Sequence, residues 1–318
     1  MMRHDNRKIA LIGTGMVGMS YAYSLLNQNV CDELVLIDVN KEKAIGEAMD
    51  LQHGLPYAQH KIDIKAGDYD ECKDADIVVI TAGATQKPGE TRLDLTITDT
   101  KIVKSVTENI MSSGFQGIIV VASNPVDLMT YVAQKVSGLP KHRVIGTGTL
   151  LDTARLRYMM SEYLGISSKN IHAYIMGEHG DSSFVPWTHA YVGCKKLLAI
   201  LDETHRDLND LQNIYVQVQQ AGYEIVNRKK STYYGIGLSL NRLCQAILKD
   251  EHVILTIAAY QNDEYGQKGL YIGVPALISA HGVEEIVTLD LNEVDQQKFN
   301  NSCETLRAII KDTIDPLL

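Results

Sequence analysis

A glycine-rich turn directly after a short apolar run constrains the fold of this chain more than any other feature. The run KIALI, residues 8–12, is followed by GTGMVG, whose glycines are Gly13, Gly15 and Gly18. A segment with helical apolar period comes next. Glycines at this spacing allow a tight turn and close packing of a helix on the preceding strand. The segment therefore predicts a strand, a turn and a helix, the first unit of a parallel α/β sheet.

A carboxylate follows where such a unit would place it beside a nucleotide. Asp38 closes the next apolar run, ELVLID, twenty residues after Gly18. It can accept hydrogen bonds from an adenosine ribose, while the amino end of the helix holds a pyrophosphate through its N–H groups. Asp38 would also repel a 2′-phosphate. The pattern predicts an NAD site rather than an NADP site, and a glycine turn that only packs helix on strand is the alternative.

Short β-branched runs alternate with longer amphipathic segments in the first part of the chain. KIALIG, ELVLIDV, ADIVVITAG and GIIVVAS are separated by helical patterns. This alternation is typical of parallel strands joined by crossover helices. It ends near Thr147, where the helical segment LLDTARLRYMMSEYLG begins. We expect an α/β protein: a Rossmann-type doubly wound parallel sheet in residues 1–147, then an α+β substrate and catalytic domain in residues 148–318.

Composition excludes several classes of protein. The 318 residues are 45% hydrophobic and 22% charged, which are ordinary values for a globular chain. The net charge of -9 disfavours nucleic acid or an anionic membrane as partner, because both need clustered Lys and Arg. No apolar run reaches the roughly 18 residues of a membrane span, and the amino end MMRHDNRK does not resemble a signal peptide. The five scattered cysteines predict reduced thiols in the core of a cytoplasmic protein without a metal site.

A second polar motif, GEHGDS at residues 177–182, holds His179. Asp152 of LDTAR is its expected partner, because a buried carboxylate holds an imidazole in one tautomer and stabilises the imidazolium. Arg155 lies three residues later on the same helical face and offers a planar fork to a carboxylate. The sequence thus predicts a proton donor beside an anion-binding group. A structural histidine near a surface ion pair is the alternative.

These motifs resemble those of the L-lactate and malate dehydrogenase family. GTGMVG, AGATQKPGETRLDL, SNPVD, LDTARLR, GEHGDS and STYYGIG occur in the family's order and spacing, from about Lys8 to the carboxyl end. The resemblance implies His179 as acid/base, Asp152 as its orienting partner and Arg92 as the loop cation that polarises the substrate carbonyl. It implies substrate contacts from Gln86, Arg92, Asn124, Asp152, Arg155 and Thr232. It implies NAD contacts from Gly13, Gly15, Val17, Gly18, Asp38, Lys43, Tyr69, Gly83, Ala84, Ser105, Ala122, Asn124 and Thr147.

The same resemblance makes Gln86 the residue that reads the substrate side chain. Malate enzymes of the family carry Arg there, because the second carboxylate of oxaloacetate needs a cation that is desolvated with it. Gln86 is neutral and suits the methyl end of pyruvate, while Lys87 is a neighbour of the reading position. Closure of this loop would bring Arg92 over the keto oxygen and exclude water. Pyruvate and lactate are therefore the expected substrates.

Three departures from the family pattern leave a broader substrate range open. Gly222 stands where lactate enzymes usually have Ala, SSFVPW replaces the more usual TELPVW, and GTGTLLDTAR resembles the branched-chain L-2-hydroxyacid dehydrogenases. The intact QKPGETRLDL, which those broader enzymes lack, favours lactate. A malate dehydrogenase is a further alternative. A protein that senses the NAD/NADH ratio without turnover is another, although the presence of His179, Asp152, Arg92 and Arg155 favours an enzyme.

Arg157 and His172 are two cations that the predicted active site does not need. Arg157 lies on a different side of the helix from Arg155, and His172 precedes His179 by seven residues. In bacterial L-lactate dehydrogenases the matching positions bind fructose 1,6-bisphosphate across a subunit interface. The resemblance therefore implies an allosteric site and a homotetramer that the effector favours. A purely structural role for both residues is the alternative.

Overall fold

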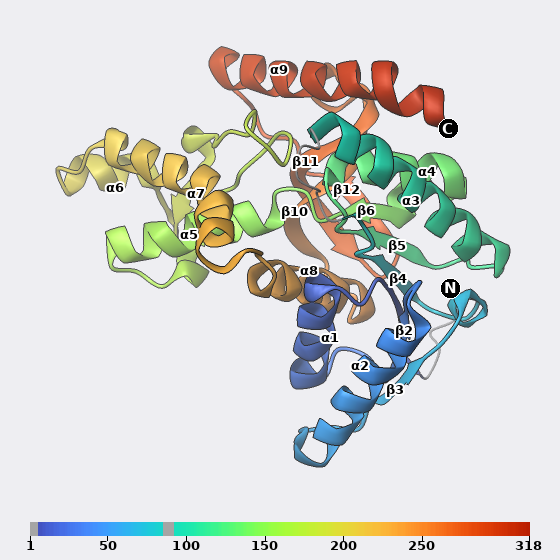
Figure 1. Cartoon of the computed structure of the whole chain (residues 1–318). Helices are drawn as coiled ribbons and strands as arrows, with labels where there is room; N and C mark the ends of the chain where they lie inside the picture. Colours follow the sequence, from blue (N-terminus) through green and yellow to red (C-terminus); the bar gives the residue numbers. More distant parts are fainter. Residues whose placement is uncertain (1–5, 85–91) are drawn as a thin grey trace.

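The computed structural model describes residues 6–84 and 92–318, and of Arg92 the backbone alone (Figure 1). The large sheet consists of β1 (Lys8–Ile12), β2 (Glu33–Ile37), β3 (Asp63–Ala66), β4 (Ile77–Ile80), β5 (Ile118–Val121), β6 (Val144–Gly146), β10 (Val253–Asn262), β11 (Lys268–Ser279) and β12 (Gly282–Ile286). A small sheet holds β7 (Ile171–His172), β8 (Tyr191–Val192) and β9 (Lys195–Lys196). The helices are α1 (Met16–Gln28), α2 (Lys41–Gly54), α3 (Arg92–Ser112), α4 (Val126–Ser137), α5 (Leu150–Leu164), α6 (Leu197–Glu203), α7 (Leu208–Lys229), α8 (Tyr234–Leu248) and α9 (Glu293–Ile309).

Strands β1 to β6 are parallel and lie in the order β6-β5-β4-β1-β2-β3. This is the strand order of a doubly wound Rossmann sheet, so the predicted fold class is confirmed. Because parallel crossovers are right-handed, α1 and α2 cover one face and α3 and α4 the other. Helices on both faces explain why β4 and β5 read as unbroken apolar runs, IVVI and IIVV, with every residue buried.

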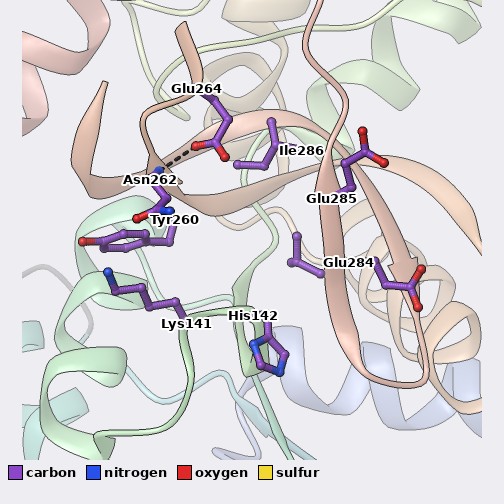
Figure 2. A pocket seen from close by; sticks show the side chains of 9 residues that line it. Lys141, His142, Tyr260, Asn262, Glu264, Glu284, Glu285 and Ile286 are labelled. Carbon is purple, nitrogen blue, oxygen red and sulfur yellow. Dashed lines mark hydrogen bonds between the residues drawn. The ribbon is translucent and has the colours of Figure 1, made fainter. Parts of the chain in front are cut away.

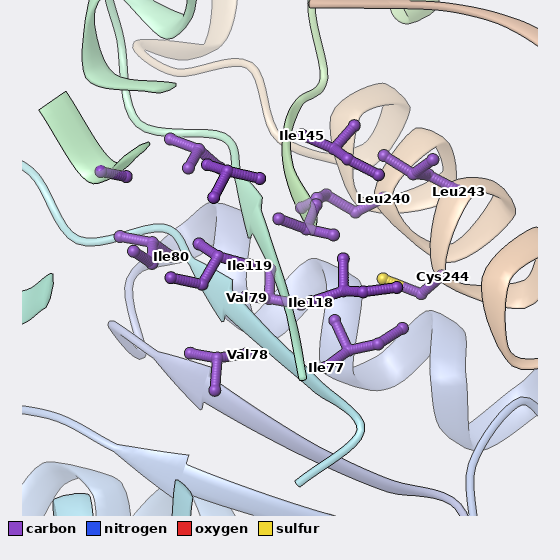
Figure 3. Close-up of a cluster of buried hydrophobic side chains, with 14 of the residues drawn as sticks. Ile77, Val78, Val79, Ile80, Ile118, Ile119, Ile145, Leu240, Leu243 and Cys244 are labelled. Carbon is purple, nitrogen blue, oxygen red and sulfur yellow. The ribbon is translucent and has the colours of Figure 1, made fainter. Parts of the chain in front are cut away.

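The second half of the chain extends the same sheet. β10 pairs antiparallel with β6 through Ala258 and Gly146, and β11 and β12 follow outward. Helix α8 packs on α1, and its Leu240, Leu243 and Cys244 lie beside the central strands (Figure 3). The sheet and its core therefore run across the position where we expect the domain boundary. The division at residue 147 stays a prediction.

A second apolar cluster holds α5 and α7 together with the small sheet. This cluster is separate from the core of the large sheet. It lies where α5 and α7 pack against each other (Figure 1). Across the described ranges, no helix combines the length and apolar character of a membrane span. Four of the cysteines are buried as predicted, but the core role is wrong for Cys194, which is exposed in the turn between β8 and β9.

Candidate active site

The glycine turn between β1 and α1 has the tight geometry that the sequence predicts. Gly13 has φ +101°, and a Cβ atom there would lie 2.8 Å from the backbone nitrogen of Ala82. A Cβ atom on Gly18 would lie 2.1 Å from the carbonyl oxygen of Gly13. A Cβ atom on Gly15, by contrast, would meet open space. The turn is therefore closed on its strand side and open at the amino end of α1, where backbone N–H groups can bind an anion.

Asp38 follows β2 and faces this turn. Its Oδ2 accepts hydrogen bonds from the backbone nitrogen (2.7 Å) and the hydroxyl (2.9 Å) of Thr14, and its Oδ1 accepts one from the backbone nitrogen of Asn40 (2.9 Å). Burial alone would raise the pKa of Asp38, but these bonds lower it below its ordinary value. A carboxylate has about four acceptor positions, so one on Oδ1 remains for a ribose hydroxyl. The carboxylate thus fits the adenosine side of NAD.

Most of the other residues predicted for the cofactor follow the carboxyl ends of neighbouring parallel strands, and two lie on helices. Tyr69 comes after β3, Gly83 and Ala84 after β4, Ala122 and Asn124 after β5, Thr147 after β6, Lys43 is in the first turn of α2, and Ser105 is an exposed residue of α3. Ala84 is fixed by a hydrogen bond from its backbone nitrogen to Asp99 Oδ1 (2.7 Å). Dinucleotides bind at this edge of doubly wound sheets. The residues at the strand ends therefore lie along the edge where a dinucleotide is expected to bind.

A cavity of about 590 Å³ lies at the junction of this edge with α5, α7 and α8. Its lining includes the predicted residues Val17, Ala122, Asn124, Thr147, Asp152, Arg155, His179 and Thr232. The predicted residues Gly13, Gly15, Gly18, Asp38, Lys43, Tyr69, Gly83, Ala84 and Ser105 do not line it. Gln86 and Lys87 fall outside the described residues, and so does the side chain of Arg92. His179 and Arg155, the predicted proton donor and anion-binding group, thus line the same cavity as four of the residues predicted for the cofactor besides Asp152 and Thr232 of the predicted substrate site.

His179, Asp152 and Arg155 form one hydrogen-bonded row in this cavity. His179 Nδ1 lies 2.6 Å from Asp152 Oδ2, and Arg155 Nη1 donates to Asp152 Oδ1 at 3.1 Å. Burial would lower the pKa of His179, but the Asp152 carboxylate outweighs it and raises that pKa to about 9. The pKa of Asp152 is lowered, because its two cationic neighbours outweigh burial. With Nδ1 engaged and the side chain 31% exposed, His179 presents Nε2 to a ligand.

A further carboxylate that we did not assign from the sequence supports the main chain of His179. Asp127 of α4 accepts a hydrogen bond from the backbone nitrogen of His179 at 2.8 Å. Burial raises the pKa of Asp127 to about 7, and the bond from His179 only partly offsets it. The motif SNPVD contains this residue, and the available signal was a carboxylate inside an otherwise apolar helical run. One carboxylate, of Asp152, therefore binds the imidazole of His179, and a second, of Asp127, binds its backbone nitrogen.

A second cavity, of about 650 Å³, lies at the antiparallel end of the large sheet and is lined by none of the predicted site residues within the described part of the chain (Figure 2). It lies between β10, β12 and the turn at residues 141–143. The amino group of Lys141 lies 3.6 Å from the centroid of the Tyr260 ring, and Glu264 accepts a bond from the backbone nitrogen of Asn262. Of the residues that the structure describes, none lines both this cavity and the cavity around His179. We therefore place the candidate active site at His179.

Comparison with known proteins gives the family. The family description "lactate/malate dehydrogenase, NAD binding domain" matches residues 7–146, and "lactate/malate dehydrogenase, alpha/beta C-terminal domain" matches residues 149–316. The chain belongs to the lactate/malate dehydrogenase family. The resemblance seen in the sequence is thus confirmed, and NAD is the cofactor that the family's first domain binds.

Individual members of the lactate/malate dehydrogenase family match over nearly the whole chain. L-lactate dehydrogenase of Geobacillus sp. (strain WCH70) is 51% identical over 316 residues, 99% of each chain, and L-lactate dehydrogenase 2 of Bacillus anthracis is 51% identical over 319 residues, 100% of each. A lactate dehydrogenase from a Medee basin deep-sea metagenome library superposes with TM-score 0.96 at 53% identity, covering 98% of this chain and 99% of that one. The ligand-bound minor L-lactate dehydrogenase of Enterococcus mundtii gives TM-score 0.95 at 46% identity, covering 96% and 98%.

Proposed function

We propose that the chain is an L-lactate dehydrogenase, which reversibly reduces pyruvate to (S)-lactate with NADH. The observation that carries this proposal is the row of His179, Asp152 and Arg155 in the cavity at the cofactor edge. Relatives named L-lactate dehydrogenase match along the full chain, which supports pyruvate over other 2-keto acids. Loss of NADH absorbance on adding pyruvate tests the activity, and a protein that only senses the NAD/NADH ratio would show none.

Three side chains of the described cavity divide the work in this proposal. Arg155 binds the carboxylate of the 2-keto acid with its planar fork. His179 donates the proton on Nε2 to the keto oxygen, and Asp152 stabilises the imidazolium and fixes its tautomer. NADH, when bound, supplies the hydride for the carbonyl carbon. Asn124 and Thr232 are further proposed substrate contacts in the lining, and by family resemblance Arg92 polarises the carbonyl and Gln86 faces the substrate side chain.

The pKa of His179 sets the expected pH dependence. Reduction needs the protonated imidazole, and this pKa is about 9, so kcat/KM for pyruvate should stay level at neutral pH and fall above about pH 9. Asp152→Asn removes the charge that raises this pKa. In that variant we expect the fall to move to lower pH and the maximal rate to drop. Initial rates from pH 5.5 to 10 measure both effects, and an unchanged profile would contradict the assigned pair.

Gly222 bears on the width of the substrate range. It lines the cavity beside the apolar Val218 and Val226, and a Cβ atom there would have no neighbour within 4 Å. The space next to Gly222 is therefore open to a longer substrate side chain, as the branched-chain alternative requires. Gly222→Ala should lower kcat/KM for 4-methyl-2-oxopentanoate more than for pyruvate. Gly46→Ala, a helical glycine with equally open surroundings on α2, is the matched control, and equal effects of Gly222→Ala on both substrates would argue against this role.

Fructose 1,6-bisphosphate activation and a homotetramer are part of the proposal. Arg157 donates from Nε to the carbonyl oxygen of Ala173 at 3.0 Å, and its guanidinium lies 4.9 Å from the centroid of the Tyr174 ring. The exposed His172 and the half-buried Tyr174, whose ring Arg157 contacts, line one cavity of about 290 Å³, and this neighbourhood supports one anion site for Arg157 and His172. The bisphosphate should lower the KM for pyruvate and shift dimers to tetramers at dilute protein. Sedimentation and initial rates that ignore the effector would leave Arg157 and His172 with a structural role.

The division into residues 1–147 and 148–318 is also proposed, and the ranges that the two family descriptions match support it. A cytoplasmic location remains an expectation from the sequence.

A further inference from the structure

The main chain around His179 forms a loop that is closed at its base. Met176 and Phe184 exchange two backbone hydrogen bonds of 2.9 Å, and Gly177 pairs in the same way with Gly273 of β11. Inside the loop, the backbone nitrogen of His179 donates to Asp127 as described above. The neighbouring backbone nitrogen, of Glu178, donates to Ser302 Oγ at 2.7 Å. Two adjacent peptide units are therefore held by two helices, α4 and α9.

Ser302 is also part of a ring of hydrogen bonds. Ser182 Oγ donates to Glu178 Oε2 at 2.5 Å and lies 2.9 Å from Ser302 Oγ. A carboxylate oxygen accepts, and each hydroxyl has a single proton to donate. Because Ser182 gives its proton to Glu178, Ser302 must donate to Ser182 while it accepts from the Glu178 nitrogen. The three bonds start and end at Glu178, the residue before His179.

The glycines that flank the Glu-His pair fit this ring. A Cβ atom on Gly177, which has φ +98°, would lie 2.9 Å from Ser302 Oγ. A Cβ atom on Gly180 would lie 2.9 Å from the carboxyl carbon of Glu178. The hydroxyl and the carboxylate thus occupy the space that larger residues would need. Ser302 is fully buried, so water does not compete for its bonds.

We propose that Ser302 of the carboxyl-terminal helix is a positioning residue for His179. It fixes the peptide between Gly177 and Glu178, next to the one that Asp127 holds, and together the two bonds direct the imidazole onto Asp152. Without the hydroxyl, the Glu178 nitrogen loses its acceptor and Ser182 loses its donor, so the loop gains freedom next to the proton donor. Ser302 is on α9, does not line the cavity and is not one of the residues predicted for the cofactor, so the Kd for NADH should not depend on its hydroxyl. The predicted change in kcat rests on the proposed function, whereas the predicted change in the pKa of His179 does not.

The first measurement uses pyruvate and NADH. Ser302→Ala should lower kcat by about tenfold or more, since small misplacements of catalytic groups are costly, and leave the Kd for NADH unchanged. Ser182→Ala breaks the same ring, so the double variant should be no slower than the slower single variant. Ser239→Ala on α8 is the matched control, because this buried serine donates to Gly235 O of its own helix. It should lower the Tm without changing kcat.

The second measurement needs no turnover. The pH dependence of the modification of His179 by diethyl pyrocarbonate, followed by peptide mass spectrometry in the protein without cofactor, reports the pKa of His179. That pKa should fall in Ser302→Ala and Ser182→Ala and stay at its wild-type value in Ser239→Ala. An unchanged pKa with kcat within twofold of wild type would overturn the inference. If Ser302→Ala does not fold, Ser182→Ala decides in the same way, and a wild type inactive with pyruvate would overturn the proposed function alone.

Discussion

His179→Asn should lower kcat for pyruvate reduction by on the order of 10²–10⁴-fold, the usual range for loss of a catalytic acid. Asn has an amide that can still reach Asp152, but it has no proton to transfer near neutral pH. Asp152 and Arg155 remain in place, so pyruvate can still bind. The glycine turn lies between β1 and α1 and Asp38 follows β2, and neither lines the cavity that holds the substituted side chain. NADH should therefore bind His179→Asn with a Kd close to that of the wild type.

Steady-state rates and a fluorescence titration with NADH together test this prediction. His205→Asn is a matched control, because His205 is exposed and has φ 52°, a left-handed conformation that Asn accepts readily. It should leave both quantities unchanged. Near-normal turnover of His179→Asn would mean that another group is the acid. Loss of NADH binding would mean that the substitution disturbs more than proton transfer.

Gln86→Arg should reverse the preference between pyruvate and oxaloacetate. Among the described residues that line the cavity, only Arg155 and His179 carry a cationic group. In the proposed function, Arg155 is engaged with the carboxylate that all 2-keto acids share. A second carboxylate would lie near apolar side chains such as Val218 and Ile236, and burying a charge without a partner is costly. Arginine at the reading position would supply the missing cation and disfavour the methyl group of pyruvate.

The ratio of kcat/KM for oxaloacetate to that for pyruvate measures this reversal. It should be well below one in the wild type and rise by about 10³-fold or more in Gln86→Arg, since charged hydrogen bonds and unpaired buried charges each contribute several kcal/mol. Lys87→Gln, which changes a charge at the adjacent residue, should leave the ratio as it is. A larger effect from Lys87→Gln than from Gln86→Arg would assign the reading position to Lys87.

The parts of the site that follow from local spacing were predictable. Gly13 comes directly after an apolar run, Gly18 closes the glycine motif that it begins, and Asp38 ends the next run, so three positions predict a nucleotide site. Asp152 and Arg155 are three residues apart on a helix, and the structure finds them hydrogen-bonded on α5. Asp152 and Arg155 share one helix, whose period is enough to predict their proximity, and the glycine turn and Asp38 follow two neighbouring parallel strands joined by one helix.

The parts that depend on contacts across the chain were not predictable. Ser302 is 124 residues from Glu178 and reads in the sequence as an ordinary helical serine. Asp127 sits in an apolar helical run, and only the fold brings it to the backbone of His179. The continuation of the sheet from β6 to β10 rests on the pairing of Gly146 with Ala258, which leaves no pattern in either segment. Tertiary packing decides these contacts, and local propensity does not encode it.

The most direct test of the proposed function compares kcat/KM with NADH for pyruvate, oxaloacetate, 2-oxobutyrate and 4-methyl-2-oxopentanoate in the unmodified protein. We expect the highest kcat/KM for pyruvate and a far lower one for oxaloacetate. This expectation rests on the neutral Gln86 and on the hydrogen-bonded row of His179, Asp152 and Arg155. The open space at Gly222 allows measurable rates with the longer substrates. A preference for oxaloacetate, or no oxidation of NADH with any of the four acids, would contradict the proposed function.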